Sequence, residues 1–133
     1  MPFKVFESVA DVTIPSGQQE SEWVSVSCPV SGAIHKVAAR QISGANVGFT
    51  VYVVSRENIT NLADAQLFSV IPALSVASGT VGQYFSDHGH PYTRVAEDYF
   101  TAHNGLFVKV RAASTLTETS VFRVSFIMRT SDE

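Results

Sequence analysis

Alternation of apolar and polar residues near the C-terminus constrains the fold of this 133-residue chain more than any other feature of its sequence. In residues 122–129 the apolar side chains recur at every second position, and Arg123 and Ser125 fall between them. The apolar set is Phe122, Val124, Phe126 and Met128. A period of two residues indicates a β-strand with one face on a core, because successive side chains of a strand point to opposite faces.

The same alternation and a β-branched composition predict further strands along the chain. Their ranges are 3–14, 24–28, 33–42, 49–54, 67–71, 74–77 and 106–112. Turn sequences such as Pro15-Ser16-Gly17 and Ser43-Gly44 separate these runs at short spacing. Pro72 cannot donate to a sheet ladder, so we expect an edge, a bulge or a bend there. About eight strands predict one all-β domain over residues 1–133, a single antiparallel β-sandwich of jelly-roll type.

Two short segments leave a choice between helix and turn. Residues 60–65 could form one helical turn. Residues 93–103 could form a helix that ends at Asn104-Gly105. The same Asn-Gly pair is a strong hairpin signal, and we favour a hairpin because an apolar strand follows at once.

Charged residues make up only 16% of the chain, against about 25% in ordinary domains. A surface poor in charge suits contact with other protein, although a β-sandwich with Ser/Thr-rich faces has the same composition. The basic residues are scattered, which predicts no nucleic-acid partner. We expect Lys109 and Arg111 to share a solvated face of their strand, and Arg123 and Arg129 likewise.

The single cysteine, Cys28, falls at an apolar position of its strand and is expected in the core. One cysteine allows no disulfide within the chain. The N-terminus lacks an apolar run of signal-peptide length, and no stretch approaches the ~18 apolar residues of a membrane helix. The sequence therefore predicts no membrane partner and a protein made in a cytoplasm.

The sharpest local feature is Asp87-His88-Gly89-His90. Two histidines one residue apart can bind one metal ion from the same side of a strand. Together with Gly82 the pair resembles the start of the first cupin motif, but Arg94 and Val95 stand where the metal-binding Glu should follow. The alternative is a polar loop facing solvent or a neighbouring subunit. We predict no metal, no cofactor and no catalytic residue, since His35 and His103 also lack partners at a catalytic spacing.

Aromatic residues offer a second kind of candidate site. Trp23 begins a strand, and Tyr84, Phe85 and Tyr92 flank the histidine pair. Aromatic side chains beside polar groups grip sugar rings or anchor protein interfaces, and they also fill cores. No binding residue is assigned on this basis.

Over its whole length the chain resembles the small all-β structural proteins of tailed bacteriophages. The opening Val12-Thr13-Ile14-Pro15-Ser16-Gly17 and the closing strand 122–129 are typical of that type. The resemblance implies a structural protein of the virion, made in the host cytoplasm. Candidates are a cement (decoration) protein that binds the major capsid protein of the head shell, often as a trimer, or a tail or fibre component. The sequence thus predicts a non-enzyme that stabilises the head.

Two other functions remain open at this stage. One is a receptor-binding or carbohydrate-binding module such as a fibre tip, and the other is a cupin-like metalloenzyme. We expect the chain to work as an assembly, either as a homo-oligomer or bound to a larger shell. Sheet edges need cover, charge or a partner, and residues 3–14 and 67–77 carry few or no charges. One of these segments is therefore the expected contact.

Overall fold

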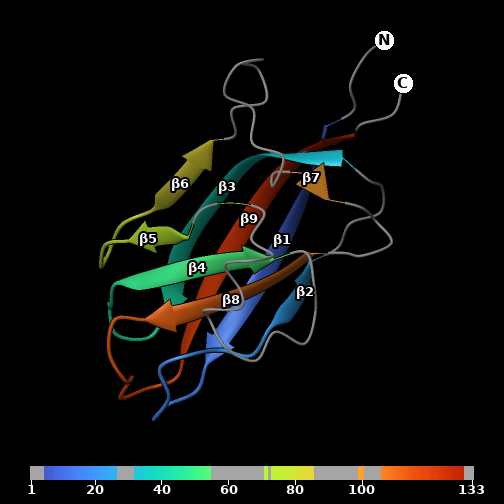
Figure 1. Ribbon diagram of the computed structural model, residues 1–133. Coiled ribbons are helices and arrows are strands. Elements are labelled where there is room, and N and C mark those ends of the chain that lie inside the picture. The colour runs from blue at the N-terminus through green and yellow to red at the C-terminus, as the bar shows by residue number, and fades with distance from the viewer. Residues whose placement is uncertain are drawn as a thin grey trace.

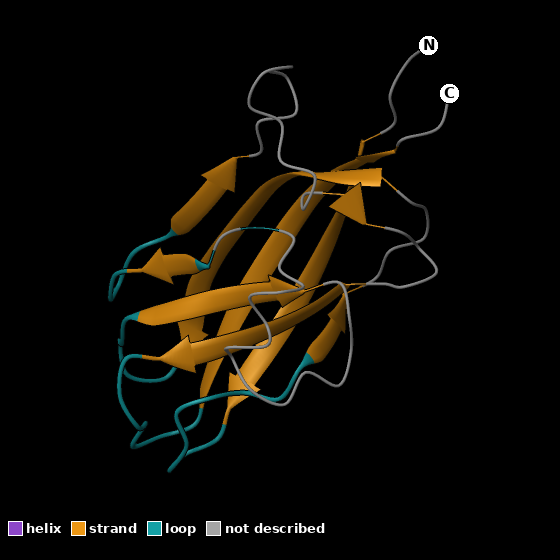
Figure 2. Cartoon of the chain, viewed as in Figure 1, coloured by secondary structure: helices purple, strands orange, loops and turns teal. Residues whose placement is uncertain are grey.

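The computed structural model describes residues 5–26, 32–54, 71, 73–85, 99–100 and 106–130. All regular structure in these ranges is β-strand (Figure 2). The strands are β1 (Val5–Ile14), β2 (Val24–Val26), β3 (Gly32–Ser43), β4 (Phe49–Val54), β5 (Leu74–Val76), β6 (Gly82–Phe85), β7 (Tyr99–Phe100), β8 (Leu106–Ala112) and β9 (Ser120–Thr130). No helix in the described ranges is long and apolar enough to cross a membrane.

The strands form two antiparallel sheets that face each other (Figure 1). Sheet A has the order β1-β9-β3-β6, and β7 adds to β3; sheet B has the order β2-β8-β4-β5. With the two-residue β7 set aside, β1 pairs with β9, β2 with β8, β3 with β6 and β4 with β5. The pairs are therefore nested in chain order, from the two ends of the chain inward. This nested pairing is the jelly roll, so the predicted all-β sandwich is confirmed.

The core lies between the two sheets and is made from the alternating inward residues of the strands. Phe122 of β9 and Phe49 of β4 meet across it, with ring centroids 4.6 Å apart and a tilt of 54°. Tilted aromatic pairs at this separation stabilise beyond the area they bury. The largest side chains with no measurable exposure are Phe122, Phe126, Ile14, Ile34, Leu106 and Met128. The core therefore joins sheet A to sheet B along the whole length of β9.

Most predicted strands match the structure closely. The ranges 49–54 and 106–112 coincide with β4 and β8, and 33–42 and 122–129 lie inside β3 and β9. Strand β5 ends at Val76, one residue earlier than expected, because the Ala77 carbonyl accepts the Thr80 amide in a turn. Ile71 is buried but belongs to no strand. Cys28, Pro72 and residues 60–65 lie outside the described residues.

The expectation for residues 93–105 was wrong where the structure describes it. Tyr99 and Phe100 form β7 rather than part of a helix, and β7 pairs with β3 in sheet A. Strand β8 lies in sheet B, where it pairs with β2 and β4. A two-residue hairpin turn joins strands that pair with each other, and among the described residues no pairing joins β7 to β8. Asn104 and Gly105 themselves lie outside the described residues.

Candidate functional site

Strand β1 forms one edge of sheet A. It pairs with β9 over ten consecutive residues without a bulge, from Val5 opposite Arg129 to Ile14 opposite Ser120. Among the described strands none pairs with the other side of β1 (Figure 1). Its sequence holds no Pro and no Lys, the residues that commonly guard an edge. A long, regular edge without Pro or Lys is a template for pairing with another chain.

The outward side chains of β1 form an exposed row beside that edge. Glu7, Val9, Asp11 and Thr13 are exposed, whereas the alternate residues from Ser8 to Ile14 are buried. Val9 keeps 52% of its surface exposed, and among the described residues only Val81, at 55%, is a comparably exposed large hydrophobic. The edge therefore offers an apolar side chain between two carboxylates.

The two carboxylates differ in their partners. Arg123 of β9 donates two hydrogen bonds to Asp11, and these bonds lower the pKa of the Asp11 carboxyl. Glu7 forms no ion pair with any described residue. It borders a shallow depression of about 100 Å³, which is lined by Glu7, Lys36, Ala38, Ser125 and Ile127. Near Glu7 the outer face of sheet A is therefore hollowed, and Glu7 and Lys36 are the charged residues of the hollow.

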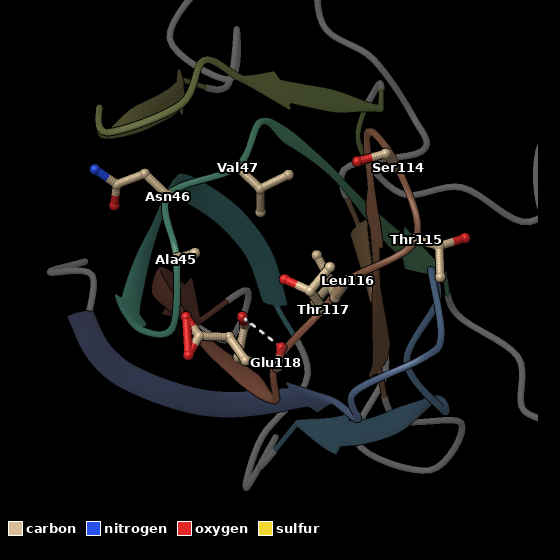
Figure 3. Close-up of a pocket in the computed structure, with 9 residues that line it drawn as sticks. Ala45, Asn46, Val47, Ser114, Thr115, Leu116, Thr117 and Glu118 are labelled. Atoms are coloured by element: carbon tan, nitrogen blue, oxygen red, sulfur yellow. Dashed lines mark hydrogen bonds between the residues drawn. The ribbon is translucent and has the colours of Figure 1, made fainter.

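The loops at the far end of the sandwich enclose a second, polar pocket of about 160 Å³ (Figure 3). Its walls come from the β3–β4 and β8–β9 connections, and Ser120 donates to the Glu118 carbonyl oxygen there. The lining residues are Ala45, Asn46, Val47, Ser114, Thr115, Leu116, Thr117, Glu118 and Ser120. None of the lining residues is aromatic, so the pocket lacks the stacking surface of a typical sugar site.

Backbone bonds hold those loops firmly in place. Gly17 donates to the Leu116 carbonyl, and Leu116 in turn donates to the Gln18 carbonyl. The Gln41 side chain donates to the carbonyls of Ser43 and Ala45, which closes the β3–β4 turn. These hydrogen bonds join the loops at this end of the sandwich to one another.

The expectation of a solvated face at Lys109 was wrong. Its side chain is only 11% exposed, because the ammonium lies 3.1 Å from the Glu20 carboxylate and 5.3 Å from the centroid of the Trp23 ring. Arg111 binds the same carboxylate. Burial raises the pKa of Glu20, but bonds and charges from Lys109 and Arg111 outweigh it and hold that pKa below its usual range. Trp23 is thus part of an ionic cluster on sheet B.

The other candidates from the sequence fall in different places. His35 is exposed on β3, and Tyr84 is half-buried against the core from β6. His88, His90, Tyr92 and His103 lie outside the described residues. Within the described ranges no three His, Cys, Asp or Glu side chains gather closely enough to hold a metal ion.

The second candidate contact segment, residues 67–77, is only partly described. Strand β5 is an edge of sheet B, as expected for this segment. However, Val76 is 4% exposed and packs in the core, so it cannot serve as a surface contact. Only β1 therefore combines an open edge, useful length and an exposed apolar side chain within the described chain.

Comparison with known proteins gives no further argument about this chain. No protein-family model and no curated protein matches the chain. Among solved structures, a chain of the capsid asymmetric unit of cyanophage Pam1 is similar over 96% of this chain and 86% of that chain, with 13% identity and a TM-score of 0.47. A likeness at that level carries no argument about the fold or the function of this chain.

Proposed function

We propose that this chain is a structural protein of a bacteriophage particle, a cement or decoration protein that binds the major capsid protein and stabilises the head shell. The observation that carries the proposal is the β1 edge, which is ten residues long, free of bulges and unguarded by Pro or Lys. Such an edge favours strand addition by a neighbouring chain. The sequence resemblance to small phage structural proteins supplies the setting.

The surface chemistry supports assembly in the same way. The chain has few charged residues, and on the β1 row one of the two carboxylates is already bound by Arg123. Protein contacts avoid the cost of burying unpaired charge, so a surface of this kind suits a shell. By analogy with cement proteins, the free protein is expected to be a homo-oligomer, with a trimer as the favoured number. It would be made in the host cytoplasm and function as part of the virion.

The test is co-sedimentation of the purified protein with head shells that lack it. The wild type should sediment with the shells, and Val9→Lys should reduce binding at least about tenfold, since it places a charge on the pairing edge. Val81→Lys is the matched control, because Val81 is equally exposed but lies in the β5–β6 turn. It should bind like the wild type.

Cryo-electron microscopy of the particle would then locate the protein, and light scattering would give its free oligomeric state. Density on the head supports the proposal. A location in the tail or a fibre would favour the receptor-binding or carbohydrate-binding alternative instead. A strict monomer that fails to bind shells would contradict both the assembly and the cement role.

A further inference from the structure

We infer that the β1 edge takes an extended segment of a different polypeptide, which carries a Lys or Arg opposite Glu7 and an apolar residue opposite Val9. This inference rests on the proposed function for the use of β1 as the contact. It adds which kind of chain occupies that edge, because a second copy of β1 and a foreign segment are distinct partners.

Pairing of β1 with its own copy places acidic residues together. Two copies of the protein can join their β1 strands antiparallel, so that sheet A continues from one copy into the other. If both cores then lie on the same side of the joined sheet, the exposed residues of one β1 lie opposite the exposed residues of the other. When the two-fold axis passes at Val9, Glu7 lies opposite Asp11 of the copy. When the axis passes at Glu7, that residue lies opposite Glu7 of the copy, and an axis at Asp11 does the same for Asp11. An axis at Ser8 or Ala10 leaves like carboxylates as diagonal neighbours, about 7–8 Å apart. Directly opposed like charges destabilise a strand pair.

Nothing within β1 offsets this repulsion. Residues 5–14 contain neither Lys nor Arg, so no register supplies a cation opposite Glu7. Arg123 lies on the far side of β1 from the open edge and is bound to Asp11. Lys36 borders the same depression as Glu7, but it lies on β3, two strands away from the open edge. On the open side of β1, a cation opposite Glu7 must therefore come from the partner.

A segment of another polypeptide can pair with the β1 backbone, bind Glu7 and cover Val9 at the same time. Its backbone extends the ladder beyond β1, its basic residue meets Glu7, and its apolar residue covers Val9, which is otherwise 52% exposed. A second basic residue, four positions away, would lie opposite Asp11. Electrostatic complementarity of this kind chooses the partner and its register more than it adds affinity.

Two synthetic peptides probe the inference directly. Both are ten residues long and alternate Val with Thr; one has Lys and the other Glu at two same-face positions four residues apart. Wild-type protein should bind the Lys peptide about three- to tenfold more tightly than the Glu peptide, measured by fluorescence anisotropy. The preference should shrink as salt rises from about 0.05 to 0.5 M, because exposed charges are screened.

Charge reversal provides the decisive variant. Glu7→Lys should abolish or invert the preference, whereas Glu22→Lys, which makes the same change of net charge at an exposed position outside β1, should keep it. Circular dichroism of each variant checks that the sandwich still forms. Equal binding of both peptides, or a preference unchanged in Glu7→Lys, would overturn the inference, as would a wild-type dimer that is lost in Val9→Lys.

The two proposals fail separately. If the protein binds shells through Val9 but does not distinguish the peptides, the cement role stands and the basic partner is wrong. If the peptides are distinguished but shells are not bound, the edge specificity stands and the capsid role is wrong.

Discussion

Arg123 on β9 holds Asp11 on β1 through two hydrogen bonds, from Nε to Oδ1 at 2.8 Å and from Nη2 to Oδ2 at 3.1 Å. The two residues lie directly opposite each other on the outer face of sheet A. These bonds lower the pKa of Asp11 and raise the pKa of Arg123. The pair therefore ties the edge strand to the body of the sheet through side chains as well as backbone.

This pair predicts a specific loss of stability in acid. Because the pKa of Asp11 is lower in the folded protein than in the unfolded chain, its stabilisation is complete at neutral pH. It is lost as the pH falls below about 4 and through the lowered pKa. Asp11→Asn should be slightly less stable at pH 7 and lose less stability on acidification. Urea unfolding from about pH 2.5 to 7, followed by fluorescence, measures both curves; parallel curves would refute the prediction.

Gly44 and Gly17 give a matched test of loop closure. Both have positive φ, 93° and 86°, so alanine costs about 1–2 kcal/mol of backbone strain at either site. At Gly44 a Cβ would also collide with Oγ of Ser120 and lie 2.8 Å from its Cβ, whereas at Gly17 nothing lies within 4 Å. Gly44→Ala should therefore destabilise the protein clearly more than Gly17→Ala in urea unfolding. Equal losses would show that the β3–β4 loop moves freely away from Ser120.

Phe122 should be among the most sensitive core positions. Its side chain has no measurable exposure and contacts Phe49 of the opposite sheet. Phe122→Ala is expected to lower the free energy of unfolding by about 3–5 kcal/mol, and Phe122→Leu by less. Val121→Ala, on the outward face of the same strand, serves as the control and should cost much less. A loss at Val121 as large as that at Phe122 would contradict the assigned faces.

Alternation identified the main strands because one face of each meets the core. The inward positions of β9 and β8 were predicted from sequence for that reason, and their register follows from it. Short β7 escaped notice, since two residues carry no period and its pairing with β3 depends on contacts distant in sequence. Local Asn-Gly chemistry pointed to a hairpin, whereas the described strands β7 and β8 lie in different sheets.

The candidate edge was predictable only in part. A scarcity of charge in residues 3–14 suggested a contact, and β1 does form a sheet edge. Asp11 lies opposite Arg123 of β9 and is bound by it, whereas Glu7 lies opposite Ile127. The sequence of one strand does not reveal which residue of its neighbour stands opposite. Likewise residues 67–77 were a candidate contact, but the inward position of Val76 on β5 buries that residue of the segment. Lys109 was misjudged because its partners come from residues 20–23, far away in sequence.

The fluorescence of Trp23 can report on the ion pair between Glu20 and Lys109. Trp23 is the only tryptophan of the chain, and its ring lies beneath the largely buried ammonium of Lys109. Glu20→Gln removes the negative charge that compensates this ammonium, which should cost about 1–3 kcal/mol of stability and change the Trp23 emission. Lys109→Met in the same background should recover part of the loss, because no uncompensated charge then stays buried. A double-mutant cycle by urea unfolding measures the coupling. Strictly additive losses would mean that Glu20 and Lys109 do not interact across β8, despite the 3.1 Å between their charged groups.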